Sequence, residues 1–338
     1  MSRPPLTYAA AGVDVAAGER AVALLRGLAE ATHGPQVLGG LGGFAGLWSL
    51  DPSRWRDPVL AAAADGVGTK LLVAQAVGRH DTVGIDLVAM VVDDLAVTGA
   101  EPLFALDYLA VGRLVPERVA AVVAGVAEGC RLARCALLGG ETAEHPDAMA
   151  PDAYDLAGFA LGVAERARLL GPERVRAGDV LLGLEASGLH ANGFSLVRRV
   201  LERAGVGYDA VPPGLGVPLA DALLVPTRIY APDLLDLRAA GAELHALCHV
   251  TGGGLPGNLP RCLPAGLVAR VDRAAWTVPP LLRWLAGLGP VEDAELAKAT
   301  NLGVGMVALL PPDQVEGAVA FLAARGLAAF PIGEVAAA

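Results

Sequence analysis

The sequence predicts an α/β or α+β fold, with mixed sheets flanked by helices and two domains. Its 338 residues are 54% hydrophobic and only 18% charged, which is enough apolar material for two cores. Strand-like runs alternate with helix-like segments in both halves of the chain. Glycine-rich loops follow strands in both halves, at the strand ends where ligand sites of such sheets tend to lie.

The first half predicts helices alternating with short apolar strands. Val22, Leu25 and Leu28 recur at helical spacing, so we expect a helix over residues 19–33. A glycine cluster (39–46) and a turn-rich connection follow. The remaining elements expected in this half are the strands 59–64, 103–111, 136–138 and 154–163 and the helices 86–98 and 116–132, the last opening with proline.

The second half begins after a stretch rich in charge and glycine, residues 165–179, which suggests domains 1–168 and 169–338. The second domain is expected to be α/β. Here we expect strands over 180–184 and 307–310, a helix over 194–204, a surface loop over 205–218 and a glycine loop over 249–254.

Composition excludes several classes of protein. A net charge of -10 argues against general affinity for nucleic acid, because there is no basic excess to displace phosphate counterions. The four cysteines form no CxxC pair and have no zinc-like spacing, so we expect buried free thiols in a reducing compartment. Residues 1–15 lack the apolar core of a signal peptide, and no run is long enough to span a membrane. We therefore expect a cytoplasmic protein without membrane or nucleic-acid partners.

The segment 65–70 combines a carboxylate, two glycines, a hydroxyl and an ammonium, which suits a metal-bound polyphosphate. Only two of the 26 basic residues are lysines, so Lys70 indicates a position that needs a compact point charge. The order Gly-Thr-Lys differs from a Walker A loop. Alone, the segment could be an ordinary turn. The residues predicted to bind a cofactor here are Asp65, Gly66, Gly68, Thr69 and Lys70.

The predicted helix 86–98 carries three carboxylates among apolar neighbours. Asp86 and Asp93 are two turns apart on one face, and Asp94 flanks that face. Clustered carboxylates in an apolar setting are costly unless a cation neutralises them, and Mg²⁺ is typically held by one or two carboxylates plus phosphates. Alternatively, Asp86 caps the helix and Asp93 faces solvent.

A further carboxylate follows the strand 136–138. The glycines before Glu141 allow a ligand to approach the backbone closely. A plain turn with exposed acids is the alternative. The candidates at this position are Gly140, Glu141 and Thr142.

His190 and His249 each follow a strand and lie beside a glycine-rich loop. A lone histidine is more often structural, but two in equivalent contexts favour a ligand or acid–base role. The second loop can present successive backbone N–H groups to an anion. The residues predicted around the substrate are Ser187, Asn192, Thr251, Gly252, Gly253 and Gly254.

At these motifs, and at 79–90, 99–108, 154–159, 226–230 and 303–306, the chain closely resembles the phosphoribosylformylglycinamidine cyclo-ligases, also called aminoimidazole ribonucleotide synthetases. The resemblance spans nearly the full length. It implies that ATP phosphorylates the formyl amide oxygen of formylglycinamidine ribonucleotide and that the amidine nitrogen then closes the ring, giving aminoimidazole ribonucleotide, ADP and phosphate. It also implies that the first domain binds ATP and dimerises, with the N-terminal strands of a homodimer meeting across the interface.

The resemblance also implies roles for individual residues. Asp65, Asp94 and Glu141 would hold Mg²⁺, while Thr69 and Lys70 would contact phosphates. His190, His249 and Asp94 would act in catalysis, and Asn192 and the Thr251 loop would hold the substrate. The chain departs from the family at Asp93, where Asn is common, and at residues 298–302.

Two alternatives remain open at the level of sequence. The chain could be another ATP-dependent synthetase of the same superfamily, but selenophosphate synthetases usually carry an N-terminal reactive cysteine or selenocysteine, and no cysteine precedes Cys130. The amidotransferase-linked synthetase of the preceding purine step is typically much longer. A catalytically silent nucleotide-binding scaffold is the other alternative, against which Asp65, Lys70, Asp94 and His249 argue.

Overall fold

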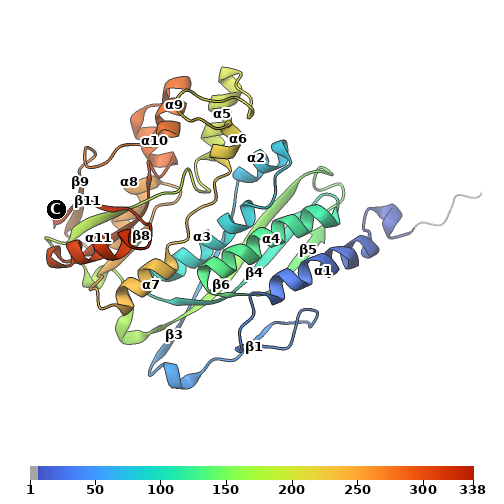
Figure 1. The fold of residues 1–338 in the computed structure, drawn as a ribbon, viewed down its shortest axis with the longest axis horizontal. Coiled ribbons are helices and arrows are strands. Elements are labelled where there is room, and N and C mark those ends of the chain that lie inside the picture. The colour runs from blue at the N-terminus through green and yellow to red at the C-terminus, as the bar shows by residue number, and fades with distance from the viewer. Residues whose placement is uncertain (1–6) are drawn as a thin grey trace, which may run out of the picture.

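The computed structural model describes residues 7–338. The first six residues, part of the segment expected not to be a signal peptide, lie outside the described residues. The chain forms two main sheets with their own helices, one from each half, as Figure 1 shows. This arrangement confirms the predicted α/β class with mixed sheets and flanking helices. No helix within residues 7–338 has the length and apolarity needed to cross a bilayer.

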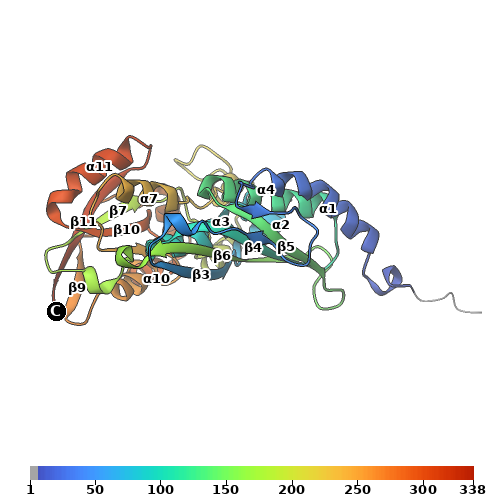
Figure 2. The ribbon, with the colours of Figure 1, turned by 90° about the horizontal axis from the view of Figure 1, so that it is seen from below.

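The first sheet has four strands in the order β3-β6-β4-β5. These strands are β3 (Pro58–Gly66), β4 (Glu101–Val111), β5 (Ala136–Glu144) and β6 (Tyr154–Glu165). Only β4 and β5 run parallel, so the sheet is mixed. Its helices are α1 (Val15–Glu30), α3 (Val83–Val97) and α4 (Pro116–Ala133). Figure 2 shows α1 and α4 on one side of this sheet, and the opposite side carries no helix from the described part of this half.

Helix α3 is almost entirely buried because it packs on the sheet with one side and on α4 with the other. Two glycines permit the close approach of the helices. A Cβ added at Gly84 would come within 2.2 Å of the Val126 nitrogen, and one at Gly125 within 2.4 Å of the Asp81 oxygen. The backbones therefore touch where any larger side chain would separate them.

The second sheet is antiparallel throughout, in the order β8-β10-β7-β11-β9. Its strands are β7 (Val180–Glu185), β8 (Ala246–His249), β9 (Leu267–Val271), β10 (Val304–Leu310) and β11 (Ala329–Ala337). Every residue of β10 is buried, since two apolar clusters cover the two faces of the sheet. Helices α7 (Ala231–Ala239) and α11 (Val315–Ala323) contribute to one of these clusters.

Smaller elements complete the chain. They are β1 (Val37–Leu38), β2 (Leu47–Trp48), α2 (Lys70–Val77), α5 (Phe194–Ala204), α6 (Leu219–Leu223), α8 (Gly254–Asn258), α9 (Pro280–Leu288) and α10 (Asp293–Ala299). All four cysteines are free thiols, and Cys262 alone is partly exposed. Helices α2 and α7 and strand β11 are among the elements that the sequence did not predict, and β5 continues through Gly139 and Gly140 instead of ending there.

Candidate active site

An aspartate–histidine pair joins the two halves. Asp94, on α3, and His249, at the end of β8, lie 2.9 Å apart between Oδ1 and Nδ1. The imidazole is 3% exposed and the carboxylate 46%, so the aspartate faces solvent while the histidine forms the wall behind it. Sequence reasoning named both residues, and the structure brings them together.

Asp65, near the end of β3, adds a second carboxylate to this pair. Partial burial and the neighbouring Asp94 charge raise the pKa of Asp65, whereas the Gly66 N–H that it accepts acts in the opposite direction. Burial alone would lower the pKa of His249, but the hydrogen bond to Asp94 and the charges of Asp93, Asp94 and Asp65 raise it above its usual value. The site therefore places more than one carboxylate around a single imidazolium, so its net charge is negative.

A cavity of about 460 Å³ opens beside the pair. Asp94 and His249 line it together with the Ala62–Ala64 edge of β3 and the polar side chains of Asn258 and Arg261. Arg261 donates to the Asn258 Oδ1 at 3.0 Å. Sequence reasoning missed Asn258 and Arg261 as site residues, and the glycine loop just before them was the available signal.

The loop Thr251–Gly254 is shaped by side chains around it. The Asn258 Nδ2 donates to the carbonyl oxygens of Gly252 and Gly254 at 3.2 and 2.9 Å, and the Gly253 N–H donates to Lys298 O at 3.0 Å. Because its carbonyls are held from behind, the loop keeps one conformation.

The loop 187–193 lies next to this glycine loop. A Cβ at Gly252 would lie 3.5 Å from the Asn192 Oδ1, so these two predicted substrate residues are neighbours. The Ser187 N–H donates to His190 Nε2 at 3.2 Å, and Ser187 Oγ donates to Pro226 O. Because Nε2 accepts, the neutral ring carries its proton on Nδ1.

The His190 side chain is buried, and its backbone lies in the left-handed region of conformational space, at φ 62°. Burial, together with the nearby His249 and Lys70, holds its pKa well below the usual value. Its Nδ1 has no hydrogen-bond partner among residues 7–338. A buried donor left open in this way is costly unless a ligand accepts from it.

Lys70 lies in a different environment from the one expected. Its ammonium is fully buried and donates to Asp86 Oδ1 (2.8 Å), His190 O (2.9 Å) and Val225 O (2.7 Å). All three donors are used, so none is free for a phosphate in this arrangement. Asp86 also accepts from the N–H and hydroxyl of Thr227. The pair instead fixes the loop that carries His190.

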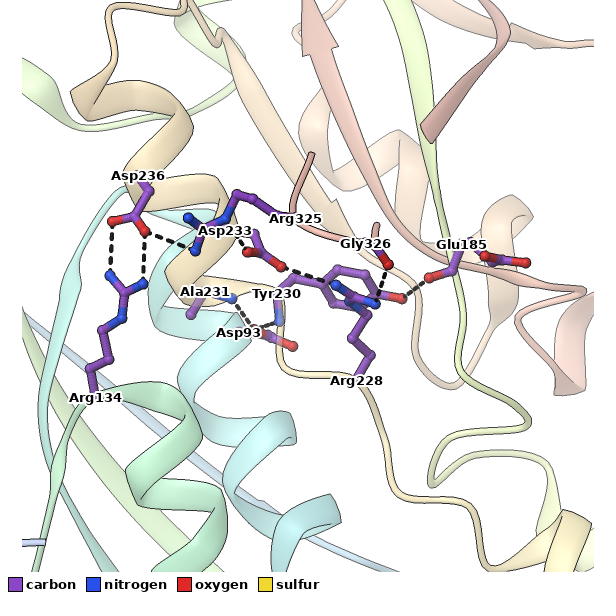
Figure 3. A network of polar contacts seen from close by, with 10 residues as sticks. All are labelled: Asp93, Arg134, Glu185, Arg228, Tyr230, Ala231, Asp233, Asp236, Arg325 and Gly326. Atoms are coloured by element: carbon purple, nitrogen blue, oxygen red, sulfur yellow. Dashed lines mark hydrogen bonds and ion pairs between the residues drawn. The ribbon is translucent and has the colours of Figure 1, made fainter. Parts of the chain in front are cut away.

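Asp93 also makes contacts that stabilise the fold. Its Oδ1 accepts the N–H groups of Tyr230 and Ala231 at 2.9 and 2.8 Å, at the N-terminus of α7, as Figure 3 shows. The second oxygen has no partner among the described residues. Asp93 therefore stabilises the N-terminus of α7, and its predicted contact with a cofactor stays a prediction.

The candidates on β5 lie apart from Asp65 and Asp94. Gly66, Ala157, Tyr108 and Glu141 form one row across all four strands, which separates Gly66 from Glu141 by roughly 14 Å at the usual strand spacing. Glu141 is exposed. Gly140 and Thr142 are its neighbours on the same strand. Within residues 7–338, no three His, Cys, Asp or Glu side chains are grouped as a metal site.

Two helix N-termini meet near the 65–70 segment. The Thr69 and Ser195 hydroxyls lie 3.0 Å apart, at the start of α2 and in the first turn of α5. Gly68 (φ 72°) and Gly193 (φ 84°) make the turns into these helices. Unpaired N–H groups of helix N-termini favour anions, so this junction suits a phosphate group.

Each half of the chain matches the model of a known protein family. Residues 51–164 match the N-terminal domain, and residues 176–338 the C-terminal domain, of the family described as "AIR synthase related protein". Similar folds include thiamine-monophosphate kinase from Stenotrophomonas maltophilia K279a (TM-score 0.69, 21% identity, 94% of each chain) and the hydrogenase maturation protein HypE in complex with ATP (TM-score 0.67, 20% identity, 95% of this chain and 86% of that one).

Curated relatives are much closer in sequence. The phosphoribosylformylglycinamidine cyclo-ligase of Thermosynechococcus vestitus is 50% identical over 332 residues, covering 98% of this chain and 97% of the relative. That of Myxococcus xanthus is 51% identical over 330 residues, covering 97% and 95%. Identity at this level over nearly the whole length shows the family. The chain therefore belongs to the phosphoribosylformylglycinamidine cyclo-ligase family.

Proposed function

We propose that the chain catalyses the ATP-dependent ring closure of formylglycinamidine ribonucleotide to aminoimidazole ribonucleotide, a ligase step of purine biosynthesis. The names of relatives at about 50% identity support this assignment. The observation that carries it is the Asp94–His249 pair, which opens on a cavity next to two ordered glycine-rich loops. The ATP-complexed HypE structure, which shares the fold, supports the use of ATP.

The residues present fit a divalent ion. The charge of Asp94 makes the ionisation of Asp65 more costly, and the second oxygen of Asp94 accepts no hydrogen bond within residues 7–338. We propose that they hold Mg²⁺, with phosphate oxygens and water as the other ligands, which is how this ion is usually bound. The ion would neutralise charge on the transferred phosphoryl group. Glu141 stays a candidate ligand only if another part of the assembly brings it close.

Phosphate groups would bind at the helix junction. We propose that Gly68, Thr69 and the first turn of α2 contact phosphate through backbone N–H and hydroxyl groups, with α5 opposite. The Gly66 N–H already donates to Asp65 Oδ1 at 2.7 Å, so Gly66 would border the phosphate without donating to it. This assignment leaves Lys70 and Asp86 as the pair that positions the loop, because the ammonium has no free donor. The loop Thr251–Gly254 and Asn192 would hold the substrate.

The two histidines suit different tasks. His249 has a raised pKa next to Asp94, so it can carry a positive charge beside the phosphoryl group that moves to the formyl oxygen. His190 is neutral and has an open Nδ1–H, which can donate to the substrate without giving up its proton. The amidine nitrogen then attacks the activated carbon, and phosphate leaves with the former formyl oxygen.

We also propose a homodimer joined through the uncovered face of the four-stranded sheet. Leu60, Tyr108 and Phe159 are 59%, 43% and 37% exposed on this face. An apolar surface of this kind commonly marks an interface. The two sheets, and the family matches on either side of residue 168, support the division into domains 1–168 and 169–338. The free thiols suit the reducing cytoplasm.

The test is a coupled assay of ADP release and aminoimidazole formation with formylglycinamidine ribonucleotide. ADP release that depends on this substrate is expected, and its absence would overturn the assignment in favour of another synthetase of the superfamily or a silent nucleotide-binding scaffold. Asp94→Asn should fold normally but lose at least about 100-fold of turnover, as expected when a charge aimed at the phosphoryl group is removed. Asp313→Asn, at an exposed site in the second half, is the matched control.

A further inference from the structure

A second cavity, also about 460 Å³, lies where the two halves meet. The start of β4 and the end of α4 form one wall, and α7 forms the other. None of its lining residues lines the cavity of Asp94 and His249. Thr98 lines the first cavity and the next residue, Gly99, lines the second.

The carboxylates that line this second cavity already have partners. Glu101 is paired with Arg54 at 2.9 Å, and Asp236 with Arg134 at 2.8 Å. Figure 3 shows the Arg134–Asp236 pair and its extension to Arg325. Glu165 accepts the N–H groups of Arg56 and Asp57. The charges of Glu101 and Asp236 are therefore neutralised by these arginines, whereas Glu165 is held by backbone N–H groups and forms no ion pair within residues 7–338.

Two other arginines of the lining lack a carboxylate. Arg238 donates only to the carbonyl oxygens of Gly99 and Arg168, and the Arg168 guanidinium has no partner among residues 7–338. A third cation, Arg174, is close by and, within the same described range, donates only to Ala167 O. Burial and the charges of Arg168 and Arg174 lower the pKa of Arg238 to about 10.

None of these three guanidinium groups forms an ion pair within residues 7–338, so their like charges repel one another, and the group on α7 is partly desolvated. An anion bound between them would remove this cost. Guanidinium groups match phosphate in shape, because two parallel N–H groups can reach two phosphate oxygens. The rest of the lining includes the apolar surfaces of Trp55, Pro102, Pro232 and Leu235, which suit an organic body attached to the phosphate.

We propose that this cavity is a second ligand site, which takes a phosphate-bearing small molecule of mononucleotide size, with its phosphate between Arg168 and Arg238. The site is separate from the proposed ATP and substrate sites. Its occupancy does not depend on whether the chain closes an imidazole ring, so binding tests it without any assay of activity.

The test measures binding of AMP and of adenosine to the full chain by calorimetry, with the ATP site saturated by a non-transferable ATP analogue and Mg²⁺. Arg168→Gln is the informative variant, because its guanidinium makes no contact within residues 7–338 whose loss could unfold the protein. Arg166→Gln is the matched control, since Arg166 lies with Arg168 in the short 3-10 helix Arg166–Arg168 but pairs with Asp57 at 2.8 Å.

We expect saturable AMP binding that weakens at least tenfold in Arg168→Gln and is unchanged in Arg166→Gln. Adenosine, which lacks the phosphate, should bind at least tenfold more weakly than AMP. If Arg168→Gln gives the same isotherms as the wild type, any AMP bound lies elsewhere and the site is excluded. Absence of AMP binding, or adenosine binding as tightly as AMP, would equally exclude it.

Discussion

Polar side chains in the core of this protein have functions that their residue types alone do not reveal. Asp86, Asp93 and Lys70 were all expected in a cofactor site, and all three are fully buried. The sequence shows that such groups are present, but their partners come from segments more than 100 residues away, such as Thr227 for Asp86 and Tyr230 for Asp93. Asp94 and His249, also named from the sequence, instead lie together at the surface of a cavity, and their roles stay predictions.

Asp93→Asn should change how stability depends on pH. Burial raises the pKa of Asp93 from 3.8 to about 7, although His249 opposes this shift. The folded state therefore keeps a proton that the unfolded state releases above about pH 4, and stability from this group falls as pH rises toward 7. We expect the variant to gain about 2–3 kcal/mol relative to wild type between pH 5 and pH 8. Urea unfolding at both values measures this, and a pH-independent difference would contradict it.

Lys70→Ala should be strongly destabilising. Removing the ammonium leaves Asp86 as an uncompensated buried charge, which typically costs about 3–5 kcal/mol. The chain's other lysine gives the control. Lys298 is 61% exposed and pairs with Glu295 at the surface, so Lys298→Ala should change the free energy of unfolding by less than about 1 kcal/mol. Equal effects in the two variants would argue against a structural role for Lys70.

At the scale of elements, sequence periodicity was a good guide where a helix has one exposed face. Helix α5 was predicted with the bounds that the structure gives, Phe194–Ala204, because its polar and apolar faces are distinct. Helix α7 was missed, since it packs between α3, α4 and α11 and its apolar residues follow no clear stripe. Strand β5 was predicted too short because pairing with β4 carries it past two glycines that would otherwise end a strand.

Two glycines inside helices have opposite surroundings, so replacing each with alanine should change stability in opposite directions. Gly84→Ala places a Cβ 2.2 Å from the Val126 nitrogen, so α4 must move and stability should fall by about 1–3 kcal/mol or more. A Cβ added at Gly27, inside α1, would meet no packing neighbour within 4 Å, so Gly27→Ala should gain about 0.5–1 kcal/mol from helix propensity. Thermal unfolding measures both, and a stabilised Gly84→Ala would show that the helices are not in contact there.

At the scale of the whole molecule, the candidate site is shared between the two halves. Asp65 and Asp94 come from the first sheet and its helix, whereas His249 and both glycine-rich loops come from the second half. Sequence order could indicate these motifs but not their distances, because strand pairing decides them. Glu141 illustrates this, since it follows a similar glycine motif and yet lies three strands away from Gly66.

The proposed dimer can be tested through the uncovered sheet face. Phe159→Asp places a charge on an apolar surface that would be buried between two copies, so it should shift the protein toward monomer. Light scattering after size exclusion measures the mass, with Val268→Asp, 38% exposed on the second sheet, as control. A monomeric wild type, or a Phe159→Asp variant that stays dimeric, would contradict this interface.

The three contacts of Lys70 also limit how early this part of the structure can form during synthesis. Its acceptors lie 16, 120 and 155 residues further along the chain, at Asp86, His190 and Val225. At typical translation rates, Val225 is added about 8–30 s after Lys70. Until then the ammonium lacks one of its three acceptors. The first half can build its sheet during this interval, but the candidate site can close only when the chain is more than half made.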